Sequence, residues 1–422
     1  MNVLILGSGG REHALSWKIA QSSLLTKLFI APGNAGTIEL GENVDMDISD
    51  FKRVKDFCLN NSIDMLIVGP EIPLVEGVVD FFRNDKQLDN IRIIGPDRHG
   101  AMLEGSKEFA KEFMEKYNIP TAAFKSFTKE SIAEARAFIN KINPPYVIKA
   151  DGLAAGKGVL ILDDANKAYK ELDEIFSGKF GEAGNKVVIE DFLKGIELSV
   201  FILTDGSSYV ILPEAKDYKR IGEGDTGLNT GGMGAVSPVP FAGSDFLEKV
   251  ETRVIKPTMR GLQEEGIDYK GFIFIGLMNM NGDPYVIEYN VRMGDPEAEV
   301  VIPRIKSDLL DIFKAVSDGT LDEKQLEIDE RSVTTVMLVS GGYPETYKKG
   351  YKIDGLDDVK DSIVFHAGTK VESENILTNG GRVLAVSSYG NNFRDALETS
   401  YKNATKIEFK DMYFRKDIGF DL

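Results

Sequence analysis

The chain has 422 residues, and its 50 Lys and Arg residues against 67 Asp and Glu residues give a formal net charge of −17. This acidic balance argues against a nucleic acid partner, because affinity for a phosphate backbone comes mostly from Lys and Arg contacts. One cysteine, Cys58, excludes an intramolecular disulfide, and three histidines disfavour a His-rich metal centre. At about 100 to 200 residues per domain, the length predicts about two to four domains.

The chain begins MNVLILGSGG, which has no basic region and too short an apolar run to resemble a signal peptide. No uninterrupted apolar segment approaches the roughly 18 to 20 residues that a membrane-spanning helix needs. The sequence therefore predicts a cytoplasmic protein with no membrane partner.

Short apolar runs alternate with stretches of helical length in the first hundred residues. Each run ends at a Gly or Pro turn, and four such runs occur, at 3–6, 28–31, 65–68 and 91–94. Apolar strands separated by helices are typical of a parallel sheet covered on both faces, where ligands bind beyond the carboxyl ends of the strands. We predict a Rossmann-like parallel-sheet domain over residues 1–102.

The rest of the chain has a different pattern. After a helical stretch at 104–118, strands come in groups of two and three, which predicts an α+β module with antiparallel sheet over 103–325. An Asn-Gly-Asp sequence between two of these strands indicates a hairpin. A charged segment at 320–331 marks the last predicted boundary, and a small β-rich domain follows over 326–422. The chain as a whole is predicted to be a multidomain α/β and α+β protein.

The first turn, GSGGREH at 7–13, is not a dinucleotide fingerprint. It has Glu12 where a third glycine is required, and no acidic residue ends the second strand. What remains is a Gly-rich turn at a helix N-terminus, whose free N–H groups, together with Arg11, favour a phosphate. A merely tight strand-to-helix turn is the alternative. Glu71, in a similar turn, suits a sugar hydroxyl, although a solvated loop carboxylate gives the same pattern.

Two lysines flank a Gly-rich loop in IKADGLAAGKGV at 148–159. The spacing excludes a P-loop, but an ammonium in an apolar strand is costly unless an anion meets it, so Lys149 and Lys157 favour a nucleotide phosphate. Glu190, Leu193 and Glu197 surround the turn between the next two strands. Backbone groups there suit a purine edge and a carboxylate suits ribose hydroxyls, while surface glutamates in a hairpin would give the same pattern.

The strongest pattern is VIEYNVRMGDPEAE at 286–299. Glu288 and Asn290 are two residues apart on a predicted strand, so they face the same side and offer the oxygen ligands that Mg²⁺ prefers. Arg292 continues on that face and is suited to neutralise a phosphoryl group in transfer. The alternative is a strand with one polar edge face.

An unusually Gly-rich segment at 214–238 carries Lys216, Lys219 and Arg220. Such a composition indicates either a disordered insertion or a lid that excludes water from reacting groups. The basic residues favour a lid that faces an anion, and residues 229–234 supply further backbone N–H groups.

These motifs together resemble the glycinamide ribonucleotide synthetases, a family of ATP-grasp ligases. Seven motifs carry the resemblance in order: GGREHAL, APGNAGT, VGPEIPLVEG, LEGSK, VIKADGLAAGKGV, NTGGMGA and GDPEAE. The resemblance covers essentially the whole chain and implies a Rossmann-like N-domain, ATP-grasp central domains with a mobile ATP-clamping subdomain at about 122–193, and a small C-terminal domain. It also implies a stand-alone, monomeric enzyme of purine biosynthesis whose partners are ATP, glycine and 5-phosphoribosylamine.

The resemblance also implies a role for each candidate residue. ATP would be held by Lys107, Lys149, Lys157, Glu190, Leu193 and Glu197, and Mg²⁺ or Mn²⁺ by Glu288 and Asn290. Substrate would be bound by Gly9, Gly10, Arg11, Glu12, Asn34, Glu71, Asp217, Gly231 and Gly232. The catalytic residues would be Arg292, Asp295 and Lys219, around the reacting carboxylate. The basic residues of these motifs predict a basic cleft in an acidic protein.

Three positions depart from the family pattern. The chain has VRMGDPE where relatives often have CRFGDPE, and Tyr218 where a His is familiar. The strand at 271–280 has no metal-binding carboxylate, so fewer ligands support a second ion. Two rival functions remain: another carboxylate-activating ATP-grasp enzyme, such as a biotin-dependent carboxylase subunit or a different purine ligase, and a non-catalytic nucleotide sensor.

Overall fold

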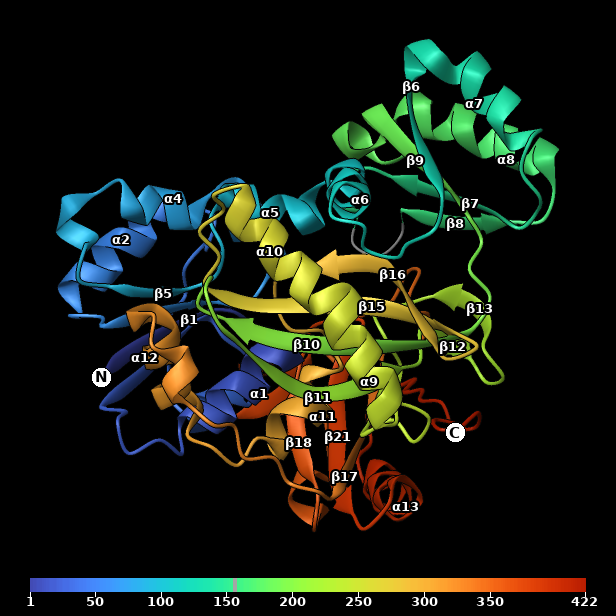
Figure 1. The fold of residues 1–422 in the computed structure, drawn as a ribbon. Helices are drawn as coiled ribbons and strands as arrows, with labels where there is room; N and C mark the ends of the chain where they lie inside the picture. Colours follow the sequence, from blue (N-terminus) through green and yellow to red (C-terminus); the bar gives the residue numbers. More distant parts are fainter. Residues whose placement is uncertain (155–157) are drawn as a thin grey trace.

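The computed structural model describes residues 1–154 and 158–422, and its first domain is built on a five-stranded parallel sheet (Figure 1). The strand order is β3-β2-β1-β4-β5. The strands are β1 (Asn2–Gly7), β2 (Lys27–Pro32), β3 (Glu42–Asn43), β4 (Met65–Val68) and β5 (Arg92–Ile94). The four apolar runs are therefore strands, and the parallel-sheet prediction is confirmed. Only the two-residue β3, which has no apolar residue, was missed.

Helices cover this sheet, and the turn after β1 leads directly into the first of them. They are α1 (Gly10–Ile19), α2 (Phe51–Asn60), α3 (Glu71–Glu76), α4 (Val78–Arg83) and α5 (Arg98–Gly105). Because β1, β2 and β4 are parallel neighbours, the turns that follow them lie at one edge of the sheet. Gly9, Asn34 and Glu71 belong to these turns.

A four-stranded antiparallel sheet forms a separate lobe above the central sheet (Figure 1). Its order is β6-β9-β7-β8. The lobe consists of β6 (Phe124–Thr128), α7 (Ile132–Ile139), β7 (Tyr146–Ala150), β8 (Val159–Leu162), α8 (Ala165–Glu174) and β9 (Lys186–Asp191). It has a hydrophobic core of its own, which includes Ile148, Leu172 and Ile189. The predicted mobility of this lobe stays a prediction.

The helix predicted at 104–118 is wrong in one respect, because the chain breaks at Ser106. Helix α5 ends at Gly105, and α6 (Lys107–Lys116) begins two residues later, after Ser106. Ser106 has an extended backbone, and its side chain accepts a hydrogen bond from the Phe109 N–H at 3.1 Å. Such a serine caps the N-terminus of a new helix. The break redirects α6 toward the lobe.

The central sheet has eight antiparallel strands in the order β16-β15-β10-β11-β14-β17-β21-β18. They are β10 (Ile196–Thr204), β11 (Tyr209–Asp217), β14 (Gly234–Ser237), β15 (Gly271–Met280), β16 (Asp283–Asn290), β17 (Ser332–Val339), β18 (Ile363–His366) and β21 (Arg382–Gly390). The predicted hairpin joins β15 and β16 through Asn281 and Gly282, which both have positive φ, at 53° and 89°. Since β14 pairs with β17, the sheet continues through the boundary predicted at 325.

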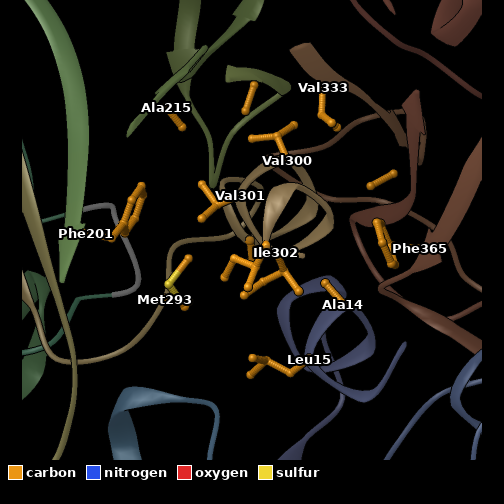
Figure 2. Packing of buried hydrophobic residues seen from close by; sticks show 14 of the residues in the cluster. Ala14, Leu15, Phe201, Ala215, Met293, Val300, Val301, Ile302, Val333 and Phe365 are labelled. Carbon is orange, nitrogen blue, oxygen red and sulfur yellow. The ribbon is translucent and has the colours of Figure 1, made fainter. Parts of the chain in front are cut away.

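Helix α11 (Ala298–Arg304) is buried along its whole length at the centre of the molecule. Figure 2 shows its Val300, Val301 and Ile302 among apolar side chains from several elements. Leu15 of α1 and Phe365 of β18 belong to the same cluster. This packing anchors the loop that precedes α11, which carries Asp295 and Glu297.

The remaining elements complete the surface. They are α9 (Ser244–Val250), α10 (Lys256–Glu264), α12 (Leu309–Asp318), α13 (Phe393–Ala404), β12 (Arg220–Gly222), β13 (Thr226–Asn229), β19 (Thr369–Glu372) and β20 (Asn375–Thr378). Among the described residues, no helix combines the length and apolar character that crossing a membrane requires.

Candidate active site

A cavity of about 320 Å³, here called the main cavity, lies where the N-terminal domain, the four-stranded lobe and the central sheet meet. Its volume is within the range of small-molecule sites. The predicted residues that line it are Arg11, Glu71, Lys107, Lys149, Glu190, Asp217, Lys219, Gly231, Glu288, Asn290, Arg292 and Asp295. The fold thus brings together most of the residues that the sequence patterns identified.

A second cavity, of about 560 Å³, adjoins the main cavity and shares Lys149, Glu190 and Glu288 with it. We call it the apolar-walled cavity. Its apolar lining consists of Val147, Val159, Ile161, Phe192, Leu193, Ile196, Met278 and Ile287. Predicted Glu197 also lies on its wall. Apolar walls with a few polar groups suit a flat heterocycle.

A third cavity, the rim cavity, lies between the first turns of the parallel sheet and the C-terminal strands. It is lined by Gly9 and Asn34 on one side and by Thr369 and Lys370 on the other. Asp295 and Arg382 line both this cavity and the main cavity. The two residues therefore stand at the junction between the two spaces.

The lysines predicted at a nucleotide phosphate are buried or nearly so. Lys149 lies on β7, forms an ion pair with Glu190 (Nζ to Oε1, 2.9 Å) and donates to the Ile287 carbonyl at 3.2 Å. Lys107 opens α6 and donates to the Gly152 carbonyl at 3.1 Å, and burial lowers its pKa. Lys157 lies outside the described residues.

The predicted metal ligands, Glu288 and Asn290, lie on β16 and line the main cavity. Burial raises the pKa of Glu288, but Lys219 and the other nearby cations outweigh it, so the pKa lies below its ordinary value. The Asn290 side chain has a buried Nδ2 without a hydrogen-bond partner among the described residues. No group of three or more His, Cys, Asp or Glu side chains suited to a metal occurs in the described part of the chain. An ionised carboxylate and an amide oxygen fit Mg²⁺, which commonly takes its other ligands from phosphates and water.

Arg292 is held by carboxylates from two other elements. Its guanidinium donates to Glu104 at 2.8 Å and to Glu71 at 3.4 Å, and it also reaches Asn290 Oδ1 at 3.3 Å. Glu104 in turn accepts the Val291 N–H at 2.8 Å. The arginine is therefore fixed beside the metal ligands, but its charge is already paired.

The loop before α11 carries buried acidic groups. Asp295 pairs with Arg382 at 2.8 Å, and Arg382 also donates to the Asp295 and Gly231 carbonyls. Burial raises the pKa of Asp295, but Arg382 and Arg11 outweigh it, so this carboxyl is ionised at neutral pH. Burial and Asp217 raise the pKa of Glu297 to about 7.

The prediction of free N–H groups in the GSGGREH turn is wrong for two of them. The Gly9 N–H donates to the Glu12 carboxylate at 2.6 Å, and the Arg11 N–H donates to Asp295 at 3.3 Å. Glu12 is buried, so its side chain closes the turn instead of facing the cavity. These two N–H groups are therefore not free, and the phosphate role of the turn stays a prediction.

Three other predicted substrate residues, Asn34, Gly10 and Gly232, offer the site no free polar side chain. Asn34 donates to the Ser8 and His366 carbonyls at 2.9 and 2.7 Å, and its oxygen accepts the Gly36 N–H. Gly10 lies close to the buried carboxyl of Glu299. Gly232 has a φ of 115° and lies against Pro296. Their substrate roles stay predictions.

The Gly-rich segment at 214–238 is ordered, which excludes the disordered alternative. It contains the end of β11, the short pair β12 and β13, and β14. Lys219 pairs with Glu197, and Lys216 lies 3.3 Å from Asp421. Arg220 donates to the Gly227 carbonyl, so these basic groups line the apolar-walled cavity with partners already in place.

The prediction of a basic cleft is also wrong. Among the described residues, the main cavity is lined by seven basic and seven acidic side chains. The basic set is Arg11, Lys107, Lys111, Lys149, Lys219, Arg292 and Arg382. The acidic set is Glu71, Glu104, Glu190, Asp217, Glu288, Asp295 and Glu297. The cavity is therefore polar and charge-balanced.

Sequence reasoning assigned no role to four charged residues that line the main cavity: Glu104, Lys111, Glu297 and Arg382. Glu104 stands in the LEGSK motif and Glu297 in GDPEAE, so motif membership was an available signal for both. Lys111 reads as a polar position on an amphipathic helix, and Arg382 as the first residue of a C-terminal strand. Nothing in the local pattern marks either as a cavity residue.

Comparisons with known proteins identify the family. Models for the three domains of phosphoribosylglycinamide synthetase match this chain: the N domain at residues 1–104, the ATP-grasp (A) domain at 105–298 and the C domain at 333–421. The phosphoribosylamine–glycine ligase of Escherichia coli K12 is 45% identical over 427 residues, covering 100% of this chain and 98% of that protein. The enzyme of the same name from Caldanaerobacter subterraneus is 43% identical over 420 residues, covering 99% of both.

Solved structures agree with these matches. The crystal structure of phosphoribosylamine–glycine ligase from Thermotoga maritima superposes with a TM-score of 0.86 at 36% identity, covering 99% of this chain and 100% of that one. A biotin carboxylase domain from Hydrogenobacter thermophilus has a TM-score of 0.73 at 15% identity, over 98% of this chain and 91% of that one, which shows a shared fold alone. This chain therefore belongs to the phosphoribosylglycinamide synthetase family.

Proposed function

We propose that the main cavity is the active site of an ATP-dependent ligase that joins glycine to 5-phosphoribosylamine. The products are glycinamide ribonucleotide, ADP and phosphate, and the reaction belongs to purine biosynthesis. The observation that carries the proposal is the meeting of Lys107 and Lys149 with the Glu288–Asn290 pair in one cavity of a chain that matches the family along its length.

ATP is placed across two cavities. Its adenine fits the apolar-walled cavity, where Leu193 and Glu197 lie. Its phosphates extend to Lys107 and Lys149 in the main cavity. Glu288 and Asn290 would hold Mg²⁺, or Mn²⁺ in its place, which supplies neutralising charge to the phosphates during transfer.

The chemistry runs in two steps, because a glycine carboxylate is a poor electrophile. A glycine carboxylate oxygen attacks the γ-phosphorus of ATP, the bond to the bridging oxygen breaks, and ADP leaves to give glycyl phosphate. The amine nitrogen of phosphoribosylamine then attacks the acyl carbon, phosphate leaves, and one amine proton is lost. Asp295 is the proposed proton acceptor because it is ionised and stands at the junction of the main and rim cavities.

Phosphoribosylamine is placed in the rim cavity with its amine toward Asp295. This arrangement puts the cationic or neutral amine beside the carboxylates at the Gly9 turn and the phosphate toward Lys370. The segment at 214–234 covers the reacting groups and keeps water from the acyl phosphate.

The proposal extends to the setting of the enzyme. We place it in the cytoplasm as a monomer that acts on small molecules and not on nucleic acid. The single cysteine, which suits a reducing compartment, supports the location. Size-exclusion chromatography with light scattering tests the monomeric state.

A phosphate-release assay tests the function. The protein is given ATP, glycine and freshly made 5-phosphoribosylamine, each is omitted in turn, and glycinamide ribonucleotide is detected by mass spectrometry. We expect product and phosphate in equal amounts only with all three substrates. Phosphate release that does not depend on glycine would contradict the proposal and favour another ATP-grasp activity, and nucleotide binding without any release would favour a sensor.

A further inference from the structure

Lys111, on the buried face of α6, contacts the same glutamate as the nucleotide lysine Lys149. Its Nζ lies 2.9 Å from Glu190 Oε2, and Lys149 Nζ lies 2.9 Å from Glu190 Oε1. The three side chains are almost completely buried: Lys111 is 2% exposed, Lys149 is 5% exposed and Glu190 is 4% exposed. One carboxylate is therefore shared between two ammonium groups, one on each of its oxygens.

The two lysines and the one glutamate of this cluster have a net charge of one positive unit. A buried carboxylate needs a counterion, and Lys149 alone would serve that purpose if Lys111 were absent. With Lys111 present, Glu190 is neutralised from the other side, and the positive charge of Lys149 remains available to an anion in the cavity. Burial lowers the pKa of Lys111 to about 8, although Glu190 raises it, so Lys111 is charged at neutral pH.

Lys111 also contacts the segment that connects the body to the four-stranded lobe. Its Nζ donates to Thr121 Oγ1 at 2.7 Å, and the Thr121 hydroxyl donates to the Val286 carbonyl on β16 at 2.7 Å. Glu190 lies on β9 of the lobe, so the ammonium ties the lobe to the connecting segment. Lys149 in turn links the lobe to β16 through the Ile287 carbonyl.

We propose that Lys111 is a positioning residue for ATP: it holds and neutralises Glu190, so that Lys149 keeps both its place and its charge for the nucleotide phosphates. This inference rests on the proposed function only in placing those phosphates at Lys149. It assigns to Lys111 no contact with the substrate. Because Glu190 pairs with both lysines, Lys149 has a counterion in the buried cluster before ATP binds.

The first test compares Lys111→Met with Lys111→Arg and with the control Lys116→Met, which removes an exposed lysine from the same helix. Binding of a non-hydrolysable ATP analogue is measured by calorimetry, and KM and kcat are measured for ATP and glycine. We expect Lys111→Met to weaken binding of the analogue and raise KM for ATP by about tenfold, with kcat and KM for glycine changed by less than about threefold. Lys111→Arg and Lys116→Met should stay within about threefold of the parent for every constant.

The second test is the double variant Lys111→Met/Glu190→Gln. Replacing the Glu190 carboxylate leaves Lys149 free to meet the nucleotide phosphates, so the double variant should bind the analogue more tightly than Lys111→Met alone. The double variant also keeps the test usable if Lys111→Met unfolds, because it removes the Glu190 charge that Lys111 no longer neutralises. Thermal melting establishes which variants are folded. Three results would overturn the inference. They are unchanged analogue binding by folded Lys111→Met, an equal rise in KM for ATP and for glycine, and a double variant that binds the analogue no more tightly than Lys111→Met. Analogue binding requires no turnover. A parent protein that binds ATP without forming product would therefore refute the proposed function, while the role of Lys111 would still be tested by the binding measurements.

Discussion

Arg382→Met tests the buried ion pair between Asp295 and Arg382 at the junction of the main and rim cavities. Arg382 is the main partner of Asp295, and its guanidinium also donates to the Asp295 and Gly231 carbonyls. Methionine fills similar volume but removes the charge and all three bonds. The change therefore leaves a carboxylate buried in the junction between the main and rim cavities, with Arg11 and Arg292 as its remaining nearby cations.

The size of the effect follows from burial. The Asp295 side chain is 7% exposed and that of Arg382 is 19% exposed. Removing one partner of a buried ion pair costs about 3 to 5 kcal/mol, and the partial exposure of Arg382 puts this pair near the lower value, at about 3 kcal/mol. Asp295→Asn should cost less, about 1 to 2 kcal/mol, because Arg382 keeps its two carbonyl acceptors. The double variant should cost less than the sum of the two single changes by about 1 kcal/mol or more.

Urea unfolding followed by the fluorescence of Trp17 measures these differences. Trp17 is the only tryptophan, and its ring lies 5.9 Å from that of Phe365, so it reports on the contact between the N-terminal and C-terminal parts. Arg394→Met, an exposed arginine on α13, is the control and should change stability by less than about 0.5 kcal/mol. A stability of Arg382→Met within 0.5 kcal/mol of the parent, or strict additivity with Asp295→Asn, would refute the assignment of this pair as a buried, coupled unit.

Three further predictions concern the substrates and pH. Glu288→Gln should lower kcat more than about a hundredfold while the melting temperature is maintained, and near-normal turnover at saturating Mg²⁺ would contradict the metal assignment. Arg11→Ala should raise KM for phosphoribosylamine by about tenfold, because Arg11 lies beside Asp295 at the junction with the rim cavity, and leave KM for ATP within about twofold; equal effects on both would contradict the separate placement of the substrates. Burial raises the pKa of Glu299 far above that of an unfolded carboxyl, so the folded state holds a proton that the unfolded state has released above about pH 4.5. Stability should therefore fall as pH rises above that value, and in urea titrations the parent should lose more stability than Glu299→Gln as pH rises, whereas a constant difference between the two would mean that Glu299 is ionised in the fold.

Strand positions were predictable because apolar runs bounded by turns report directly on burial. Every strand run expected in the first domain is present, and the Asn281-Gly282 turn lies where the hairpin requires it. The break at Ser106 was missed because the charged residues on both sides of it are ordinary in helices, whereas the capping bond depends on one side chain. The continuity of the central sheet was also beyond local pattern, since the β14–β17 pairing joins segments almost a hundred residues apart.

The candidate site was predictable where a polar residue interrupts an apolar or Gly-rich pattern. Lys149 and Glu288 stand out for that reason, and the fold places both in the main cavity. Glu104 and Lys111 sit on helices where charged residues are ordinary, so only the tertiary structure shows that they are buried. Asn34 shows the opposite case, because a conspicuous turn residue proves to be engaged by backbone groups.

Local sequence patterns did not predict the charge balance of the main cavity. Most of the cations, though not Lys111 and Arg382, were recognised in their motifs, but their acidic partners come from other elements: Glu104 of α5 meets Arg292 after β16, and Glu197 of β10 meets Lys219 after β11. Pairing allows a chain of net charge −17 to bury cations at a cavity without a bound anion. An anionic substrate must then compete with carboxylates already in place, so selectivity depends on geometry and metal as well as charge. On this argument, ATP binding should release at least one of these ion pairs, and the Arg292–Glu104 pair beside the metal ligands is the one best placed to open.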